Sequence, residues 1–108
     1  MLFRLMDIQE TSKEFKYTFS NDETIQLVLK TEIYKLFTPY YLYDIKVTYE
    51  YMIVNPTIFQ MLGVVVKKTK NAVHIQCGKT HWRFPIAVCK LKPGIDVWIS
   101  VVFINEKN

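Results

Sequence analysis

Apolar and polar residues alternate with a period of two along much of this chain, and this pattern constrains the fold more than any other feature. The alternation is clearest over residues 15–19, 25–29, 45–53 and 95–103. Successive side chains of a β-strand point to opposite faces, so each segment predicts a strand with one buried face. The last segment also carries Trp98 on its second face, which predicts a strand covered on both sides.

Turn sequences separate these segments. They stand at residues 20–23, 38–39, 70–71 and 92–94, and each contains Pro, Gly or Asn, which turns favour. A short helix is expected from Asn55 through Leu62, because Asn is a good cap and a proline follows at the first helical position. No segment sustains a helical period over three turns, and no internal sequence repeat is visible.

Short strands in one small domain must hide their edges, and a closed barrel does this most simply. We therefore expect residues 1–108 to form a single all-β antiparallel barrel with at most one short helix; an open two-layer sandwich is the alternative. The seven Tyr, seven Phe and two Trp suit pleated surfaces. No run approaches ~18 uncharged apolar residues, so we expect no membrane span, and we expect no signal peptide at the N-terminus.

Charge is distributed unevenly along the chain. Residues 1–54 hold six Lys and Arg against eight Asp and Glu, a net charge of −2, whereas residues 55–108 hold eight against two, a net charge of +6. Segment 67–92 contains seven basic residues and no acidic one. Such a segment meets phosphates or an acidic protein surface, or it is a solvated lysine face. The candidate nucleic-acid contacts are Lys67, Lys68, Lys79, Arg83 and Lys90.

The segment VHIQCGKTHWRF, residues 73–84, contains a Gly-Lys-Thr and invites interpretation as a phosphate-binding loop. That motif requires a glycine where Val73 stands, and it requires a helix to follow. Strand-like sequence and then Pro85 follow instead. Without the amides of a helix N-terminus there is no phosphate cradle, so we reject this interpretation.

Two further interpretations of this segment are a metal site and a nucleophile site. A zinc site needs His74, Cys77, His81 and Cys89 to converge, but positions 74 and 77 point to opposite faces of a strand. A Cys-His nucleophile pair needs an exposed thiol and an orienting acid, and segment 67–92 contains no acid. We therefore predict no catalytic residue, no metal ligand and no cofactor, with both thiols reduced and buried.

A β-hairpin remains as the prediction for this segment. Residues 73–77 form one strand, 78–80 the turn and 81–88 the second strand. Trp82 and Phe84 then face the core. The other face is wet and basic, with Lys79, His81 and Arg83.

Four segments, taken in chain order, resemble motifs of a known family. IQLVLKTEIY at 25–34 is similar to an L-T-L-D-I-N strand and the apolar segment after it, and FQMLG at 59–63 resembles a Y-V-M-Y-G strand. Segment 73–84 resembles a V-Y-x-S-F-G-G-L-L-M-x-L hairpin, and DVWISVV at 96–102 is similar to V-Y-L-L-I-R. The family is the small eighth subunit shared by nuclear RNA polymerases I, II and III, which has a shorter archaeal counterpart.

The similarity extends over residues 3–104, with departures. Lys79 stands where the family has its second glycine, Lys30 stands where it has an acid, and a long acidic insertion before the 59–63 strand is missing. The resemblance implies a Greek-key barrel of the oligonucleotide-binding (OB) type. It implies a non-catalytic structural subunit that docks on the largest polymerase subunit, has at most indirect nucleic-acid contact, and resides in the nucleus, or in the cytoplasm if archaeal or viral.

Two other functions stay open. A free single-strand-binding OB protein would combine the basic residues above with tyrosines that stack on bases, and a viral or plasmid protein would bind a host complex. For a docking protein, the segment TPYYLYD at 38–44 holds the candidate partner contacts, because tyrosine is enriched at interface anchors. These candidates are Tyr40, Tyr41 and Tyr43.

Overall fold

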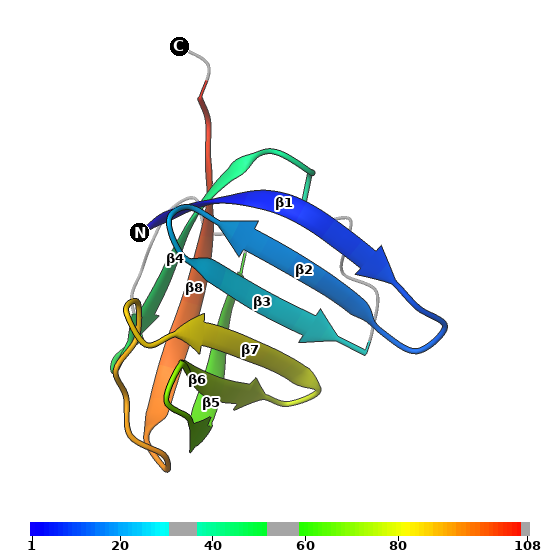
Figure 1. The fold of residues 1–108 in the computed structure, drawn as a ribbon. Helices are drawn as coiled ribbons and strands as arrows, with labels where there is room; N and C mark the ends of the chain where they lie inside the picture. Colours follow the sequence, from blue (N-terminus) through cyan, green and yellow to red (C-terminus); the bar gives the residue numbers. More distant parts are fainter. Residues whose placement is uncertain (31–36, 52–58, 107–108) are drawn as a thin grey trace.

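The computed structural model describes residues 1–30, 37–51 and 59–106, which form an all-β protein without helix (Figure 1). The described strands are β1 (Leu2–Glu10), β2 (Phe15–Ser20), β3 (Thr24–Leu29), β4 (Leu42–Thr48), β5 (Phe59–Lys68), β6 (Ala72–Cys77), β7 (Thr80–Pro85) and β8 (Asp96–Ile104). They close into an antiparallel barrel in the order β1-β2-β3-β7-β6-β5-β8-β4. This confirms the predicted fold class, a closed antiparallel β-barrel consistent with the OB type. Among these residues, no helix is long and apolar enough to cross a membrane.

The barrel consists of two Greek keys with the same topology. In a Greek key, three strands joined by hairpins are followed by a fourth that returns beside the first. Here β4 returns beside β1, and β8 returns beside β5. The two keys join where β3 pairs with β7 and where β4 pairs with β8. Each described strand therefore has two neighbours, which removes the exposed edges that would invite aggregation.

Local irregularities also repeat between the two keys. The register of β1 against β2 shifts at Met6, and the register of β5 against β6 shifts at Val66, which marks a β-bulge in each first strand. The bulged side chains are similarly exposed, Met6 by 46% and Val66 by 50%. The two keys therefore share a bulge as well as a strand order.

The turn before each fourth strand repeats as well. Tyr40 N–H donates to the carbonyl of Leu5, and Gly94 N–H donates to the carbonyl of Val65, both at 2.7 Å. Leu5 and Val65 are the residues just before the two bulges. Tyr40 has a φ of 68° and Gly94 a φ of 90°, and a proline precedes each of them. The turn predicted at residues 92–94 is therefore confirmed, and it has a structural counterpart at Tyr40.

Aromatic side chains fill the barrel. The largest fully buried side chains include Trp82, Tyr17, Tyr43, Phe3, Phe19 and Phe84. The predicted inward faces of segments 15–19, 25–29 and 73–77 are confirmed, because their alternate residues are buried, apart from the partly buried Phe15. The ring of Phe37 packs in the core, with its centroid 5.1–5.7 Å from those of Tyr17, Phe19, Tyr43 and Phe59.

Two predicted elements are wrong in extent near the middle of the chain. The strand predicted over 45–53 ends at Thr48, whose hydroxyl donates to the carbonyl of Glu50 at 2.9 Å; the last residues of that prediction lie outside the described ones. The helix expected through Leu62 is also wrong, because residues 59–62 belong to β5. Its first residues, 55–58, lie outside the described part. Pairing with β8 over these residues outweighs the local helix-start sequence.

The ends of two further strands also differ from prediction. The strand predicted to Val88 ends at Pro85, which has no N–H to offer a sheet. Ile86 and Val88 follow in a turn and pack against the core. The strand β1 was not predicted, because the bulge at Met6 breaks the period of two in its sequence.

Candidate functional site

Two of the three predicted partner contacts, Tyr40 and Tyr41, border a pocket of about 320 Å³. We call it the tyrosine pocket. Most of its lining comes from the last two residues of β8 and the two residues that follow. The full lining is Tyr40, Tyr41, Phe103, Ile104, Asn105 and Glu106.

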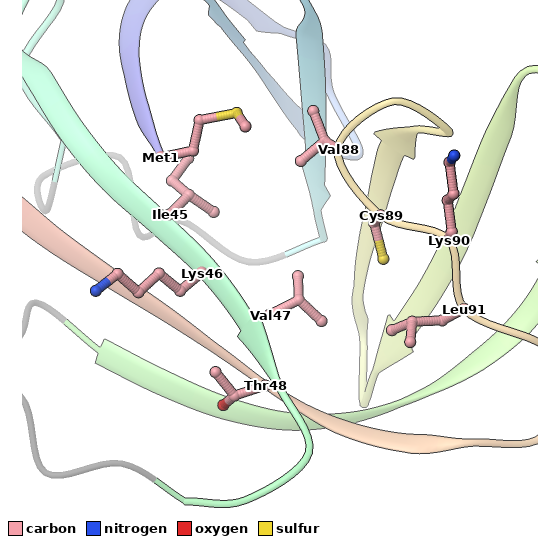
Figure 2. Close-up of a pocket in the computed structure, with 9 residues that line it drawn as sticks. All are labelled: Met1, Ile45, Lys46, Val47, Thr48, Val88, Cys89, Lys90 and Leu91. Atoms are coloured by element: carbon pink, nitrogen blue, oxygen red, sulfur yellow. The ribbon is translucent and has the colours of Figure 1, made fainter.

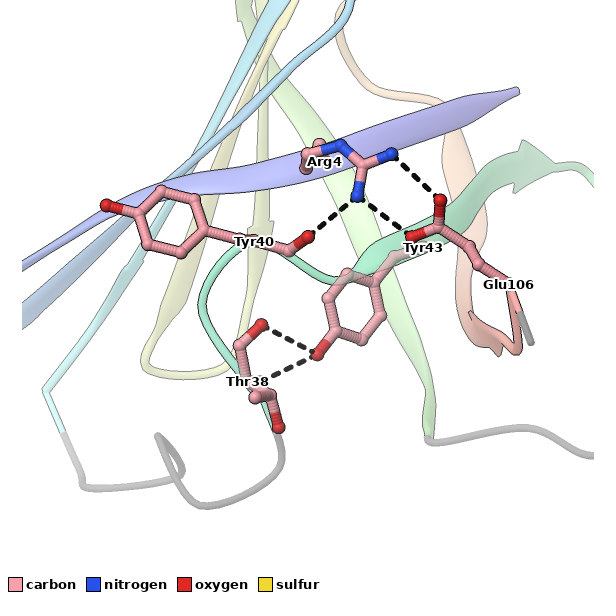
Figure 3. Close-up of polar contacts among 5 residues, drawn as sticks. All are labelled: Arg4, Thr38, Tyr40, Tyr43 and Glu106. Atoms are coloured by element: carbon pink, nitrogen blue, oxygen red, sulfur yellow. Dashed lines mark hydrogen bonds and ion pairs between the residues drawn. The ribbon is translucent and has the colours of Figure 1, made fainter.

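The loop that carries Tyr40 is held by hydrogen bonds at several points (Figure 3). Arg4 Nη1 donates to the Tyr40 carbonyl at 2.7 Å, and Leu5 N–H donates to the Tyr41 carbonyl at 3.0 Å. Figure 3 shows the Tyr40 ring extending away from Arg4 and Glu106 while its carbonyl faces Arg4. The backbone is thus fixed while the Tyr40 side chain is 64% exposed.

Tyr43 does not contribute to this surface, and its prediction as a partner contact is wrong. Its side chain is 1% exposed because position 43 points into the barrel from β4. Its hydroxyl accepts from Thr38 N–H at 2.7 Å and donates to the Thr38 carbonyl at 3.4 Å (Figure 3). Burial raises the pKa of Tyr43. Tyr43 therefore supports the loop from inside and does not face a partner.

The remaining lining of the tyrosine pocket is aromatic and charged. Tyr41 stacks on Phe103 with centroids 5.4 Å apart and rings tilted by 26°. Glu106 receives two hydrogen bonds from Arg4, at 2.8 and 3.0 Å, the two-pronged geometry that suits arginine and carboxylate. Hydrogen bonding in this pair raises the pKa of Arg4 and lowers that of Glu106. The pocket thus combines aromatic faces with a compensated ion pair at its rim.

Sequence reasoning missed Arg4, Phe103 and Glu106 as parts of this site. Arg4 and Glu106 are 102 residues apart in the chain, and no local pattern links them. Phe103 was predicted only as a core position, on the inward face of the last strand. Only strand order, which brings β1 and β8 to either side of β4, places the three together.

A second pocket, of about 350 Å³, lies between β4 and the segment after β7. Figure 2 shows Val88, Cys89 and Leu91 on that segment facing Met1, Ile45 and Val47, with Lys46 directed away. The Cys89 thiol is buried, and this burial raises its pKa. A protonated thiol is a poor nucleophile, so this apolar pocket offers no activated group.

The predicted basic contacts do not form one patch. Lys67 and Arg83 both pair with His74, from opposite sides, on the outer face of β5, β6 and β7. Lys79 lies in the turn between β6 and β7, and Lys90 lines the second pocket. Lys68 is the exposed last residue of β5. Only Lys67 and Arg83 are therefore brought together.

The predicted opposite orientation of His74 and Cys77 is confirmed. Cys77 is a buried free thiol, and burial raises its pKa to about 11. It lies against Gly63, where an added Cβ would also come within 2.9 Å of the Gln76 carbonyl oxygen. In the described residues, no group of three or more His, Cys, Asp and Glu side chains is arranged to hold a metal ion.

Comparison with known proteins gives no family model and no curated relative that matches this chain. The functional argument therefore rests on the geometry of the two surfaces, the tyrosine pocket and the outer face of β5, β6 and β7.

Proposed function

We propose that this protein is a non-catalytic docking subunit of a multi-subunit complex, and that the tyrosine pocket contacts the partner. The single observation that carries the proposal is the backbone of Tyr40. A bulky residue at positive φ is a genuine outlier, and the left-handed conformation costs about 1–2 kcal/mol for a residue with a Cβ. The ring gains little burial in return, since it is 64% exposed.

The second Greek key supplies the control for this argument. Its equivalent turn has Gly94 at the same left-handed position and with the same hydrogen bond to the first strand. Glycine adopts that conformation without steric cost. A tyrosine at the equivalent turn is therefore not required by the fold, and strained residues of this kind gather at functional sites.

The loop is also prepared for binding before any partner arrives. Phe37 anchors it in the core, the Tyr43 hydroxyl holds Thr38, and Arg4 holds the Tyr40 carbonyl. Ordering such a loop on binding would otherwise oppose association. Tyrosine is enriched among the residues that dominate binding energy at interfaces, and a preordered loop lowers the cost of docking it.

For the complex, the proposal is a DNA-dependent RNA polymerase, with the largest subunit as partner. The support is the resemblance over residues 3–104 to the eighth subunit of the nuclear polymerases, together with a closed antiparallel barrel of the kind that the resemblance implies. Location in the nucleus, or in the cytoplasm for an archaeal or viral protein, is part of the same proposal.

The alternative, a free single-strand-binding protein, requires aromatic and basic side chains along one groove. Here Tyr40 and Tyr41 lie beside β1 and the end of β8, whereas Lys67 and Arg83 lie on β5 and β7. β5 pairs with β8 in antiparallel register, so Lys67 at the end of β5 lies near the start of β8, whereas the tyrosine pocket lies at the end of β8. This separation favours the docking function.

The test is purification of the tagged full-length chain from its native host, with Tyr40→Gly as the main variant. We expect the largest polymerase subunit to co-purify, and we expect about tenfold less of it with Tyr40→Gly, as for loss of an interface anchor. Glycine suits the backbone at position 40, so lost binding would not reflect unfolding. Tyr49→Gly is the matched control, because Tyr49 is also exposed but lies outside the pocket.

The outcomes separate the parts of the proposal. Recovery of the polymerase subunit at the same level with Tyr40→Gly would remove the tyrosine pocket as the docking surface. Absence of polymerase subunits would remove the polymerase assignment. Single-strand binding below micromolar that weakens steeply with salt, and that is lost in Lys67→Ala with Arg83→Ala, would establish the alternative.

A further inference from the structure

The two histidines lie next to each other on the outer face of the β6–β7 hairpin, which contributes no residue to the tyrosine pocket. His74 Nδ1 is 2.9 Å from His81 Nε2, and the ring centroids are 5.1 Å apart. Both residues stand on paired strands, where His74 faces Arg83 and His81 faces Gln76. The sheet therefore fixes the spacing of the two rings.

A chain of hydrogen bonds determines where the protons of these rings lie. Gln76 Nε2 donates to the Gly78 carbonyl at 2.7 Å, which leaves Gln76 Oε1 facing His81 Nδ1 at 2.9 Å. An amide oxygen only accepts, so His81 carries its proton on Nδ1 and a lone pair on Nε2. His74 Nδ1–H donates to that lone pair.

We infer that His74 Nδ1 and His81 Nε2 form a chelating site for a divalent transition-metal ion of the kind that imidazole prefers, Ni²⁺ or Cu²⁺. A metal–nitrogen bond is about 2.0–2.1 Å long, so two ligands at a right angle stand about 2.9 Å apart. The two nitrogens now stand at the 2.9 Å of their N–H···N hydrogen bond, so an ion that takes the place of this proton needs no backbone movement to reach both. Among the divalent first-row ions, affinity for a nitrogen pair rises to Cu²⁺ and falls again at Zn²⁺, which favours Cu²⁺ as the tightest-binding ion.

The rings are ready to bind. Burial lowers the pKa of both histidines, so the neutral forms that metals require predominate at pH 7.5. Gln76 fixes the tautomer and ring orientation of His81, as outer-shell partners of metal-bound histidines do. On binding, the His74 proton leaves Nδ1 for solvent and Nε2 takes one up, so the ring stays neutral.

Two neighbouring charges oppose the ion. Lys67 and Arg83 flank His74 in register, and their positive charges contribute to the lowered pKa of His74. The same repulsion acts on a bound cation. Among the described residues, no third His, Cys, Asp or Glu side chain joins the two imidazoles to form a ligand group. Water would therefore complete the coordination of the ion.

The test is calorimetric titration of the untagged full-length chain with Ni²⁺ at pH 7.5. We expect one ion per chain, and at least about tenfold weaker binding in His74→Ala and in His81→Ala, because the second ligand otherwise binds intramolecularly. Gln76→Ala should weaken binding about tenfold through His81 orientation. The combined Lys67→Gln and Arg83→Gln variant should bind more tightly than the parent.

The affinity series decides the inference. Binding that is absent up to millimolar Ni²⁺, or equal in parent and His74→Ala, would overturn it. Electron paramagnetic resonance of the Cu²⁺ form gives an independent measure, with two coordinated nitrogens expected in the parent and one in either histidine variant. Unchanged circular dichroism of each variant would show that lost binding comes from the lost ligand.

Discussion

The two Greek keys have the same topology, bulge and turn, but they fill equivalent core positions differently. Phe3 and Gly63 are equivalent, because each stands three residues before the bulged residue of its strand. Phe3 pairs with Tyr43 on β4, and Gly63 pairs with Val97 on β8. Phe3 fills its position with a fully buried ring. At Gly63 an added Cβ would lie 2.9 Å from the side chain of Ile75. A repeated backbone therefore does not require a repeated distribution of side-chain volume.

The outer faces differ in charge at equivalent positions. In each key, the residue just after the bulge begins a row of three paired residues, one on each of the first three strands. The rows are Asp7, Thr18 and Gln26 in the first key, and Lys67, His74 and Arg83 in the second. The uneven charge of the sequence thus becomes a neutral-to-acidic wall beside a basic one. The fold tolerates either, since these side chains point outward.

The largest expected effect comes from exchanging the packing strategies of the two keys. Phe3→Ala should destabilise the protein by about 3–5 kcal/mol, because it empties a closed core position. Gly63→Ala should cost about 1–3 kcal/mol for the opposite reason, since the added methyl group overpacks β5 against β6. Urea denaturation of each variant measures both effects. A Gly63→Ala protein as stable as the parent would show that β5 and β6 separate easily, which would remove this difference between the keys.

The fold class was predictable because most strands of the barrel, though not the bulged β1, leave a period-two pattern in the sequence. The faces of β2, β3, β6 and β8 were predicted correctly from this pattern alone. The repeat of the Greek key was not predictable, because hydrogen bonding defines it and the matched residues differ in type. Phe3 matches Gly63, and Tyr40 matches Gly94, so sequence comparison between the halves finds nothing.

The candidate site was predictable only in part. Tyr40 and Tyr41 stood out because a cluster of tyrosines after a proline exceeds what a short loop buries. Tyr43 was misassigned because its strand begins at Leu42, earlier than the alternation indicated, which turns position 43 inward. The contribution of Arg4 and Glu106 depends on contacts between the two ends of the described chain, and local sequence holds no information on these.

A smaller effect is expected at the paired turns, with opposite signs. Gly94→Ala should destabilise by about 1–2 kcal/mol, because it puts a Cβ at positive φ. Tyr40→Gly relieves the same strain and so stabilises the folded protein. The greater freedom of glycine in the unfolded chain offsets this gain by about 0.4–1 kcal/mol. We therefore expect Tyr40→Gly to be as stable as the parent or slightly more stable in thermal and urea unfolding. Marked destabilisation by Tyr40→Gly would mean that the ring stabilises the monomer, and would weaken the case for a docking role.

The smallest effect concerns the first hairpin of each key, where the same threonine turn recurs. The hydroxyls of Thr11 and Thr69 each accept from the backbone N–H three residues on, at 3.1 Å in both turns. The Thr69 bond is partly buried, and only two residue pairs follow the bulge in its hairpin, against four in the hairpin of Thr11. A side-chain hydrogen bond contributes about 0.5–1.5 kcal/mol, so we expect Thr69→Val near the upper end and Thr11→Val near the lower. Both follow from urea unfolding, with hydrogen exchange of the hairpin amides as a local measure. Equal losses of unfolding free energy would show that the longer hairpin depends on its turn as much as the shorter one does. The two keys would then be closer in energetics than their packing indicates.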